Sequence, residues 1–307
     1  MMAQGRATCE GPPVTILVTN AGSTEKWTHR LRELLPDRRI ENVVDAVDPA
    51  DVEYVVTWRS DPAWLRSLPN LKAILQTGAG FDHLDLDAFP AVPAVRLVDP
   101  GMADDIALFV VSWVIHFQRD FDRFRDAQPA ADWIDPSPRF PRDVTVGVFG
   151  AGAIGNVVID HLDRLGFETI GWSRSSHDRP MLQFFADADI VVDLVPLSAA
   201  TRGVIGADEL TALGDGVLVN VGRGATVDTD ALLEALDGDL RHAVLDVFET
   251  EPLPQDSPLW RHPKVTVTPH IAGRTDPHTA AEVVVASIAE LEAGRLPDAT
   301  IPGTGPG

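Results

Sequence analysis

The stretch Asp143-Val-Thr-Val-Gly-Val-Phe-Gly150-Ala-Gly152-Ala-Ile-Gly155 decides the fold of this chain. Its apolar run from Val144 to Phe149 predicts a buried strand, and the residues that follow carry apolar side chains at helical spacing. The three glycines form a GxGxxG pattern. In order, they permit a tight turn, allow the backbone to approach a pyrophosphate closely, and let the helix pack closely on the strand. A helix N-terminus also offers free N–H groups to phosphate. We therefore predict a dinucleotide site with cofactor contacts at Gly150, Gly152, Ala153, Ile154 and Gly155.

Length and composition limit the classes to which this protein can belong. The chain has 307 residues, of which 45% are hydrophobic, so we expect two domains of ordinary size. No apolar run approaches the roughly 20 residues of a membrane span, and the polar N-terminus does not resemble a secretory signal. The one cysteine, Cys9, leaves no intrachain disulfide and no cysteine-based metal site. We expect a cytoplasmic protein with no metal and no membrane partner.

The charge is strongly negative. Forty-six acidic residues oppose 25 basic ones, which gives a net charge of −21, and only three of the basic residues are lysine. Such a field repels nucleic acid, so we expect no nucleic-acid partner. An ordinary acidic cytosolic enzyme is one interpretation. The scarcity of lysine favours another, a halophilic protein adapted to molar salt, where the Debye length falls to about 3 Å and self-repulsion is screened.

Both halves of the chain alternate strand and helix patterns, which predicts parallel sheets. Predicted strands cover residues 14–19, 52–58 and 71–75 in the first half, and 144–149, 189–194, 216–221, 242–247 and 265–267 in the second. Asp99-Pro100-Gly101 breaks the pattern and marks a crossover between domains. We interpret the apolar stripe on the following helix as a domain or dimer contact, formed by Ile106, Phe109, Val110, Trp113, Val114 and Phe117.

Polar or glycine residues follow the ends of several predicted strands. Gly78-Ala79-Gly80 exposes backbone N–H groups after one strand, although a plain turn would have the same sequence. Arg223, Glu251 and His270 each follow one of three consecutive strands in the second half. Open parallel sheets bind ligands at the carboxyl ends of their strands. We therefore expect the three polar residues to belong to one active site.

The residues Ser173-Arg174-Ser175 indicate the choice of cofactor. NAD-binding versions of the motif carry an acidic residue near this place for the ribose 2′-hydroxyl, and Ser173 lies there, 18 residues past Gly155. A hydroxyl and a guanidinium suit a 2′-phosphate, which a carboxylate would repel. We predict that NADP(H) is preferred and that NAD(H) is possible. The alternative is an arginine exposed on a turn.

Four motifs, in this order, resemble the D-isomer-specific 2-hydroxyacid dehydrogenase family. They are Gly78-Ala79-Gly80-Phe-Asp, Asn220-Val-Gly-Arg223-Gly224, Asp246-Val-Phe-Glu-Thr-Glu251-Pro252 and Thr268-Pro269-His270-Ile-Ala. The resemblance covers nearly the whole chain. Three further features are similar to its glyoxylate/hydroxypyruvate reductase branch: Trp58, Trp172-Ser-Arg-Ser175 and Gln255-Asp-Ser-Pro-Leu-Trp260.

The resemblance implies an α/β fold of two Rossmann-like parallel-sheet domains, one flavodoxin-like and one dinucleotide-binding, with an active-site cleft between them, and a homodimer. The substrate-binding domain would comprise residues 1–100 and 276–307, and the dinucleotide-binding domain residues 101–275. His270 would be the general acid/base, Arg223 would hold the substrate and Glu251 would support the histidine. Substrate contacts would come from Trp58, Gly78, Ala79, Gly80, Arg223 and His270. Asp246 would contact the nicotinamide end, and we expect further cofactor contacts at Val195, Pro196, Thr201, Val221, Gly222, His270, Ala272 and Gly273.

The chemistry of these residue types suits the reduction of a 2-oxo acid. The reaction needs a hydride donor, a proton donor for the carbonyl oxygen and a cation for the carboxylate. Histidine exchanges a proton near neutral pH, and arginine binds a carboxylate bidentately. We predict an NADP(H)-preferring D-2-hydroxyacid dehydrogenase, with a dedicated glyoxylate/hydroxypyruvate reductase as the alternative.

Two other functions remain open from the sequence. A dinucleotide-sensing, co-repressor-like interaction protein is one, and the retention of Arg223, Glu251 and His270 argues against it. Phosphite or formate oxidation is the other, but formate enzymes pair their histidine with glutamine, where this chain has Glu251. One residue departs from the branch: Arg274 stands where a small or apolar residue is common. We expect it to face solvent, although a cation near the pocket would favour acidic substrates.

Overall fold

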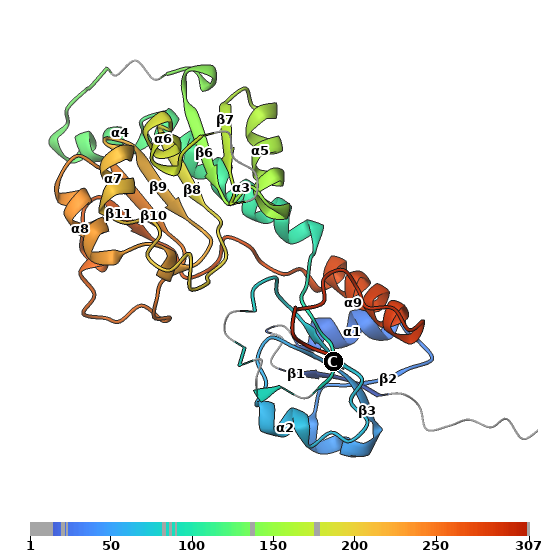
Figure 1. The fold of residues 1–307 in the computed structure, drawn as a ribbon. Helices are drawn as coiled ribbons and strands as arrows, with labels where there is room; N and C mark the ends of the chain where they lie inside the picture. The colour runs from blue at the N-terminus through green and yellow to red at the C-terminus, as the bar shows by residue number, and fades with distance from the viewer. Residues whose placement is uncertain are drawn as a thin grey trace, which may run out of the picture. The chain divides into compact units, whose positions relative to one another are not determined.

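The computed structural model describes residues 15–19, 22, 24–81, 84–85, 88–89, 91–135, 139–174 and 179–305. The chain divides into two compact units (Figure 1): residues up to Gly101 together with those from Thr275 onward, and Met102–Arg274. Each unit is built on one parallel sheet with helices packed against it. The predicted α/β class with two parallel sheets is therefore confirmed.

The first unit contains a five-stranded sheet with strand order β2-β1-β3-β4-β5, in which every pair is parallel. Its elements are β1 (Thr15–Thr19), α1 (Thr24–Leu34), β2 (Arg39–Glu41), β3 (Val52–Thr57), α2 (Pro62–Arg66), β4 (Ala73–Gln76), β5 (Ala94–Val95) and α9 (Pro277–Glu292). This order is the flavodoxin-like one, with its reversal between β1 and β3. The last helix, α9, lies beside α1 (Figure 1), and both pack on the same face of the sheet through Trp27, Leu31 and Val284.

The second unit contains a six-stranded parallel sheet with strand order β11-β10-β9-β8-β6-β7. Its elements are α3 (Pro100–Gln118), α4 (Phe121–Ala127), β6 (Thr145–Phe149), α5 (Ala153–Arg164), β7 (Glu168–Trp172), α6 (Met181–Asp187), β8 (Ile190–Asp193), α7 (Ala207–Leu213), β9 (Val217–Asn220), α8 (Thr229–Asp237), β10 (His242–Leu245) and β11 (Val265–Val267). The order reverses between β6 and β8. Open sheets bind ligands beside such a reversal, at the carboxyl ends of the strands.

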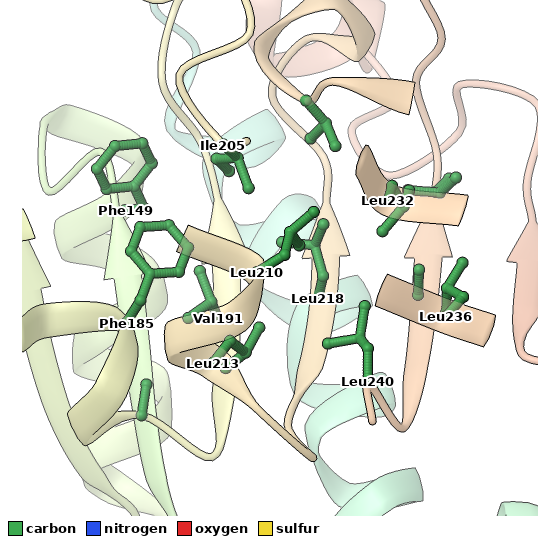
Figure 2. Close-up of a cluster of buried hydrophobic side chains, with 14 of the residues drawn as sticks. Phe149, Phe185, Val191, Ile205, Leu210, Leu213, Leu218, Leu232, Leu236 and Leu240 are labelled. Atoms are coloured by element: carbon green, nitrogen blue, oxygen red, sulfur yellow. The ribbon is translucent and has the colours of Figure 1, made fainter. Parts of the chain in front are cut away.

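One face of this sheet is covered by α6, α7 and α8. Figure 2 shows Phe185 of α6 beside Phe149 of the sheet, with Leu218 of β9 beneath the helices. The rings of Phe149 and Phe185 have centroids 5.4 Å apart in an edge arrangement. Burial of each side chain of this size stabilises the folded state by about 1.5–3 kcal/mol. The packing therefore holds the strand ends, and the loops that leave them, in fixed positions.

The long helix α3 is partly a core helix. Ile106, Val110, Val114 and Phe117 are buried, and the Phe117 ring lies 5.2 Å from the His242 ring of the same unit. Phe117 therefore packs within the second unit, and the interpretation of the stripe as a domain or dimer contact stays a prediction. By length and composition alone α3 could cross a membrane, contrary to the expectation that no apolar run approaches that length. However, 44% of its most apolar 18-residue stretch is buried inside the protein.

Candidate active site

The glycine turn after β6 has the geometry that its sequence pattern predicts. Gly150 adopts a φ of 109°, in the region that favours glycine. The backbone N–H groups of Gly150 and Ala151 both donate to the Trp172 carbonyl, at 2.8 and 3.0 Å. A Cβ atom at residue 155 would lie 2.3 Å from the Gly150 carbonyl oxygen, so α5 packs directly on the turn. The turn is tight because both glycines lack a side chain.

Gly152 leaves open space at the start of α5. A Cβ atom added there would meet no described atom within 4 Å. The first turn of α5, which includes Ala153 and Ile154, contributes the unpaired N–H groups of a helix N-terminus. The turn also lies against the end of β8, because a Cβ atom at residue 150 would be 2.9 Å from the Val195 nitrogen. Open space and N–H groups at the reversal of strand order fit the pyrophosphate of a dinucleotide.

The segment after β7 lies beside this turn. Trp172, which accepts the hydrogen bonds of the turn, is followed directly by Ser173 and Arg174. The Arg174 side chain is exposed and Ser173 is half-buried. Ser175, the third predicted contact, lies outside the described residues. Arg174 is therefore positioned next to the turn that would hold the phosphates.

The loops after β8 and β9 contact each other. Thr201 closes the first loop, because its hydroxyl donates to the Pro196 carbonyl at 2.7 Å and accepts from the Ser198 nitrogen at 2.8 Å. A Cβ atom at residue 222 would lie 3.1 Å from the Val195 carbonyl oxygen. Val221, just before Gly222, is buried. The predicted cofactor contacts Val195, Pro196, Thr201, Val221 and Gly222 are thus neighbours at the carboxyl edge of the sheet.

His270 and Glu251 form a hydrogen-bonded pair. Nδ1 of His270 lies 2.8 Å from Oε2 of Glu251, and the other carboxylate oxygen accepts from the Phe248 nitrogen at 3.0 Å. The two side chains are 46% and 37% exposed. No described residue hydrogen-bonds to Nε2 of His270, so this nitrogen is free to meet a ligand. Glu251 and His270 are thus in direct contact, and the support of the histidine by Glu251 stays a prediction.

Asp246 fixes the loop that carries His270, a role that the sequence reasoning missed. Its buried carboxylate accepts from the Thr268 hydroxyl at 2.5 Å and from the backbone nitrogens of Ile271 and Ala272 at 2.9 and 2.8 Å. Its own carbonyl accepts from the His270 nitrogen at 2.8 Å. These bonds hold His270 in a left-handed conformation with a φ of 53°. The contact between Asp246 and the nicotinamide stays a prediction.

The arginine loop lies against the loop of Glu251. A Cβ atom at residue 224 would be 2.0 Å from the Phe248 carbonyl carbon, so Gly224 is in tight contact with that loop. Arg223, the residue before it, is half-buried, and its Nη1 donates to the Gly222 carbonyl at 2.7 Å. The structure therefore brings the loops of Arg223, Glu251 and His270 together at one edge of the second unit.

In the first unit, Trp58 and the Gly78-Ala79-Gly80 loop are in contact. A Cβ atom at residue 78 would lie 2.2 Å from Cζ3 of the Trp58 ring, so the indole covers Gly78. Ala79 and Gly80 are half-buried. The hydroxyl of Thr275 donates to the Thr77 carbonyl at 2.9 Å, which ties the loop to the returning C-terminal segment. The predicted substrate contacts of this unit thus form one group.

Two other sequence-based expectations concern Arg274 and metals. The Arg274 side chain is exposed, and its backbone nitrogen donates to the Asp105 carboxylate at 2.9 Å. The preceding Gly273 packs on Ile106 of α3, where a Cβ atom would lie 2.6 Å from the isoleucine side chain.

Among the described residues, no group of three or more His, Cys, Asp or Glu side chains is arranged to hold a metal ion.

Comparison with known proteins identifies the family. Residues 111–272 match the model of the D-isomer specific 2-hydroxyacid dehydrogenase NAD binding domain. A D-isomer specific 2-hydroxyacid dehydrogenase from Xanthobacter autotrophicus Py2, solved with NADPH and MES, is 34% identical over 95% of this chain and 98% of that chain, with a TM-score of 0.88. The NADPH-dependent glyoxylate/hydroxypyruvate reductase from Sinorhizobium meliloti, solved with NADP and sulfate, is 31% identical over 94% of this chain and 98% of that chain, with a TM-score of 0.86.

A third solved structure shares the fold at lower sequence identity. The NAD-complexed D-isomer specific 2-hydroxyacid dehydrogenase from Lactobacillus delbrueckii ssp. bulgaricus is 21% identical over 94% of this chain and 100% of that chain, with a TM-score of 0.78, and shows the fold alone. The resemblance that the four sequence motifs indicated is confirmed. This chain is an NAD(P)-dependent enzyme of the D-isomer specific 2-hydroxyacid dehydrogenase family.

Proposed function

We propose that the enzyme is an NADP(H)-preferring D-2-hydroxyacid dehydrogenase that reduces 2-oxo acids to D-2-hydroxy acids. The observation that carries this proposal is the contact of 2.8 Å between His270 and Glu251, on a loop that packs beside the arginine loop. A proton donor and a carboxylate-binding cation are thereby available at one edge of the sheet. The reduction of a 2-oxo acid requires both.

Each residue has a distinct part in this reaction. The nicotinamide cofactor, when bound, supplies the hydride. His270 in its protonated form donates the proton on Nε2 to the substrate carbonyl oxygen, while Glu251 accepts the hydrogen bond from Nδ1–H and stabilises the imidazolium. Arg223 binds the substrate carboxylate through its planar fork of donors. Trp58 and the Gly78-Ala79-Gly80 loop are the proposed contacts for the remainder of the substrate.

The preference for NADP(H) rests on Arg174. This exposed guanidinium follows the strand that accepts the hydrogen bonds of the glycine turn, and the described residues from Trp172 to Arg174 contain no carboxylate. Two relatives about one-third identical to this chain were solved with NADPH or NADP. We therefore expect the 2′-phosphate to be bound beside Ser173 and Arg174.

Replacing Arg174 tests the cofactor preference. Arg174→Ala should lower kcat/KM for NADPH by about tenfold or more, because a hydrogen bond to a charged group contributes about 1.5–3 kcal/mol. The same variant should leave kcat/KM for NADH unchanged. Arg164→Ala, at another exposed arginine of the same unit, is the matched control. An unchanged ratio between the two cofactors in Arg174→Ala would refute this assignment.

A dedicated glyoxylate/hydroxypyruvate reductase is the second candidate, favoured by the similarity to the Sinorhizobium meliloti enzyme. A panel of 2-oxo acids distinguishes the two functions, with NADPH oxidation followed in high salt. Activity that persists from glyoxylate to branched 2-oxo acids would support the broader dehydrogenase, and activity confined to glyoxylate and hydroxypyruvate the dedicated reductase. If none of the 2-oxo acids is reduced while NADPH still binds, the result would point instead to a dinucleotide sensor.

We also propose that the enzyme is a cytoplasmic homodimer. Large apolar side chains are exposed on α3, on α4 and in the segment that follows: Leu108, Phe121, Phe124, Trp133 and Phe140. Trp133 is 94% exposed, which is unusual for so large an apolar group. Exposed large apolar side chains concentrated in one stretch of the chain, residues 108–140, favour a protein interface there. Sedimentation should give a dimer for the wild type and a monomer for a Leu108→Glu, Phe121→Glu double variant.

A further inference from the structure

Asp193 is a buried acid at the carboxyl end of β8 that the proposed reaction does not use. It pairs with Phe149 of β6 and Asn220 of β9, beside the reversal of strand order, and its exposed fraction is 0%. Oδ1 accepts from the Val195 nitrogen at 3.0 Å. Oδ2 lies 2.5 Å from the hydroxyl oxygen of Thr226. Thr226 is the last residue of the short helical turn (Gly224–Thr226) that directly follows Arg223.

The Thr226 hydroxyl connects Asp193 with the main chain of Arg223. Its oxygen lies 2.5 Å from the Arg223 carbonyl oxygen. The same carbonyl accepts from the Thr226 nitrogen at 3.1 Å and from Nδ2 of Asn220 at 3.2 Å. The carbonyl of Arg223 is therefore the point at which three donors hold the arginine loop, and one of those donors contacts Asp193.

A count of hydrogens shows which form of Asp193 fits these contacts. The Thr226 hydroxyl has one hydrogen but lies 2.5 Å from two oxygens. If Asp193 is ionised, that hydrogen serves only one of them, and the other close contact joins two oxygens with no hydrogen between them. If Oδ2 of Asp193 carries a proton, Asp193 donates to Thr226 and Thr226 donates to Arg223. Both contacts are then hydrogen bonds.

We propose that Asp193 is a positioning residue that works as a neutral carboxylic acid and, through Thr226, holds the main chain of Arg223 in place. The inference rests on the proposed role of Arg223 as the group that binds the substrate carboxylate. The chain of donors runs from Oδ2–H of Asp193 to Thr226 and from Thr226 to the Arg223 carbonyl. Loss of the Asp193 proton removes one of these hydrogen bonds. The affinity of Arg223 for the substrate carboxylate therefore depends on pH.

The surroundings of Asp193 favour its neutral form. Burial raises the pKa of the Asp193 carboxyl to about 7, against the opposing effect of its hydrogen bonds with Thr226 and Val195. Neither neighbouring strand, β6 or β9, carries a charged side chain. Among the described residues, the ionisable side chains on the loops at this edge of the sheet include Arg223, Asp246, Glu251 and His270. The Asp246 carboxylate is engaged by the histidine loop, and Glu251 and His270 pair with each other. Titration near pH 7 lies within the working range of an enzyme.

The test compares wild type with Asp193→Asn across pH. The asparagine amide can donate to Thr226 and its oxygen can accept from Val195, so the variant reproduces the neutral acid at every pH. Because the two proteins differ only at residue 193, the ratio of their KM values isolates the effect of Asp193. We expect equal KM for the 2-oxo acid at about pH 6, and at about pH 8.5, above the Asp193 pKa, a KM several-fold higher in the wild type. The KM for NADPH should not differ at either pH.

Thr226→Val and Asp193→Ala complete the comparison. Each removes a link, so each should raise the KM for the 2-oxo acid at both pH values, with little further change as pH rises. An Asp193→Asn profile that follows the wild type at all pH values would overturn the proposal. So would an Asp193→Asn enzyme with the raised KM of Asp193→Ala at about pH 6, because the neutral amide would then have failed to replace the acid.

Thermal unfolding separates this proposal from the proposed function. The folded-state pKa of Asp193, about 7, is above the unfolded value of about 3.9, so the folded wild type binds more protons between these values and loses stability as pH rises through them. The Tm of Asp193→Asn minus that of wild type should increase over the same window. If no 2-oxo acid is reduced, the proposed function fails while this result still reports on Asp193. If the difference in Tm between Asp193→Asn and wild type did not change with pH, the proposal that Asp193 is neutral in the folded protein would be wrong.

Discussion

The carboxylate of Glu251 occupies the Nδ1 side of the His270 ring at 2.8 Å, so Nε2 is the nitrogen left to exchange a proton with substrate. His270→Ala should lower kcat by a factor of about 10²–10⁴, the usual contribution of general acid–base catalysis, and should leave NADPH affinity largely intact. Steady-state kinetics and a fluorescence titration measure the two. His161→Ala removes another histidine paired with an acid and is the control. Equal loss of turnover and of NADPH binding would contradict the role of His270.

Arg223 should be sensitive even to a conservative replacement. Lysine keeps the charge but offers a point charge in place of the bidentate fork. Arg223→Lys should therefore raise the KM for 2-oxo acids by about tenfold or more, since a hydrogen bond to a charged group contributes about 1.5–3 kcal/mol. Arg202→Lys, at an exposed arginine paired with Glu249, controls for the change of residue type. Wild-type kinetics in Arg223→Lys would mean that the carboxylate binds elsewhere.

Sequence reasoning found the residues of the site by their place after strands but could not assign all of their contacts. Arg223, Glu251 and His270 were predicted because each follows the end of a strand. Asp193 and Thr226 were missed, because a polar residue at a strand end gives no sign of burial or of a hydrogen-bond partner 33 residues away. The support that Asp246 gives to the histidine loop was missed for the same reason.

The β6–α5 turn offers a pair of matched substitutions. At Gly155 a methyl group would lie 2.3 Å from the Gly150 carbonyl, whereas at Gly152 it would meet nothing within 4 Å. Gly155→Ala should therefore lower the free energy of unfolding by about 1–3 kcal/mol, as overpacking does. Gly152→Ala should unfold like the wild type but bind NADPH more weakly, because the added methyl group fills the space proposed for the pyrophosphate. NADPH binding at wild-type affinity in Gly152→Ala would contradict the proposed site.

The elements that the sequence predicted best are the buried central strands. The predicted strands 52–58 and 144–149 correspond to β3 (Val52–Thr57) and β6 (Thr145–Phe149), since buried parallel strands read as continuous apolar runs. The edge strand β2 (Arg39–Glu41) was missed because two of its three residues are charged, as edge strands often are. For α3 the apolar stripe was recognised, but only the packed unit shows which of its residues are core.

The whole molecule carries 46 acidic residues against 25 basic ones. Even if every basic residue paired with an acid, 21 acidic charges would remain. Ion pairs between two exposed side chains, for example Arg164–Asp160 and Arg202–Glu249, contribute about 0–1 kcal/mol each. They offset little of the repulsion. The fold is that of its relatives, so the excess charge is a property of the surface rather than of the architecture.

We therefore expect salt to stabilise this enzyme. Self-repulsion of a strongly charged compact state falls as the Debye length shortens from about 10 Å at 0.1 M to about 3 Å at 1 M. The Tm should rise between dilute and molar KCl, with each kcal/mol gained worth about 2–4 °C for a domain of this size. A variant with three exposed acids neutralised, Asp215→Asn, Glu234→Gln and Asp239→Asn, should show a smaller rise. Sucrose strengthens apolar burial without screening charge and should stabilise both proteins equally. If KCl raised the two Tm values by the same amount, charge screening would not be the cause, and the halophilic interpretation would lose its physical basis.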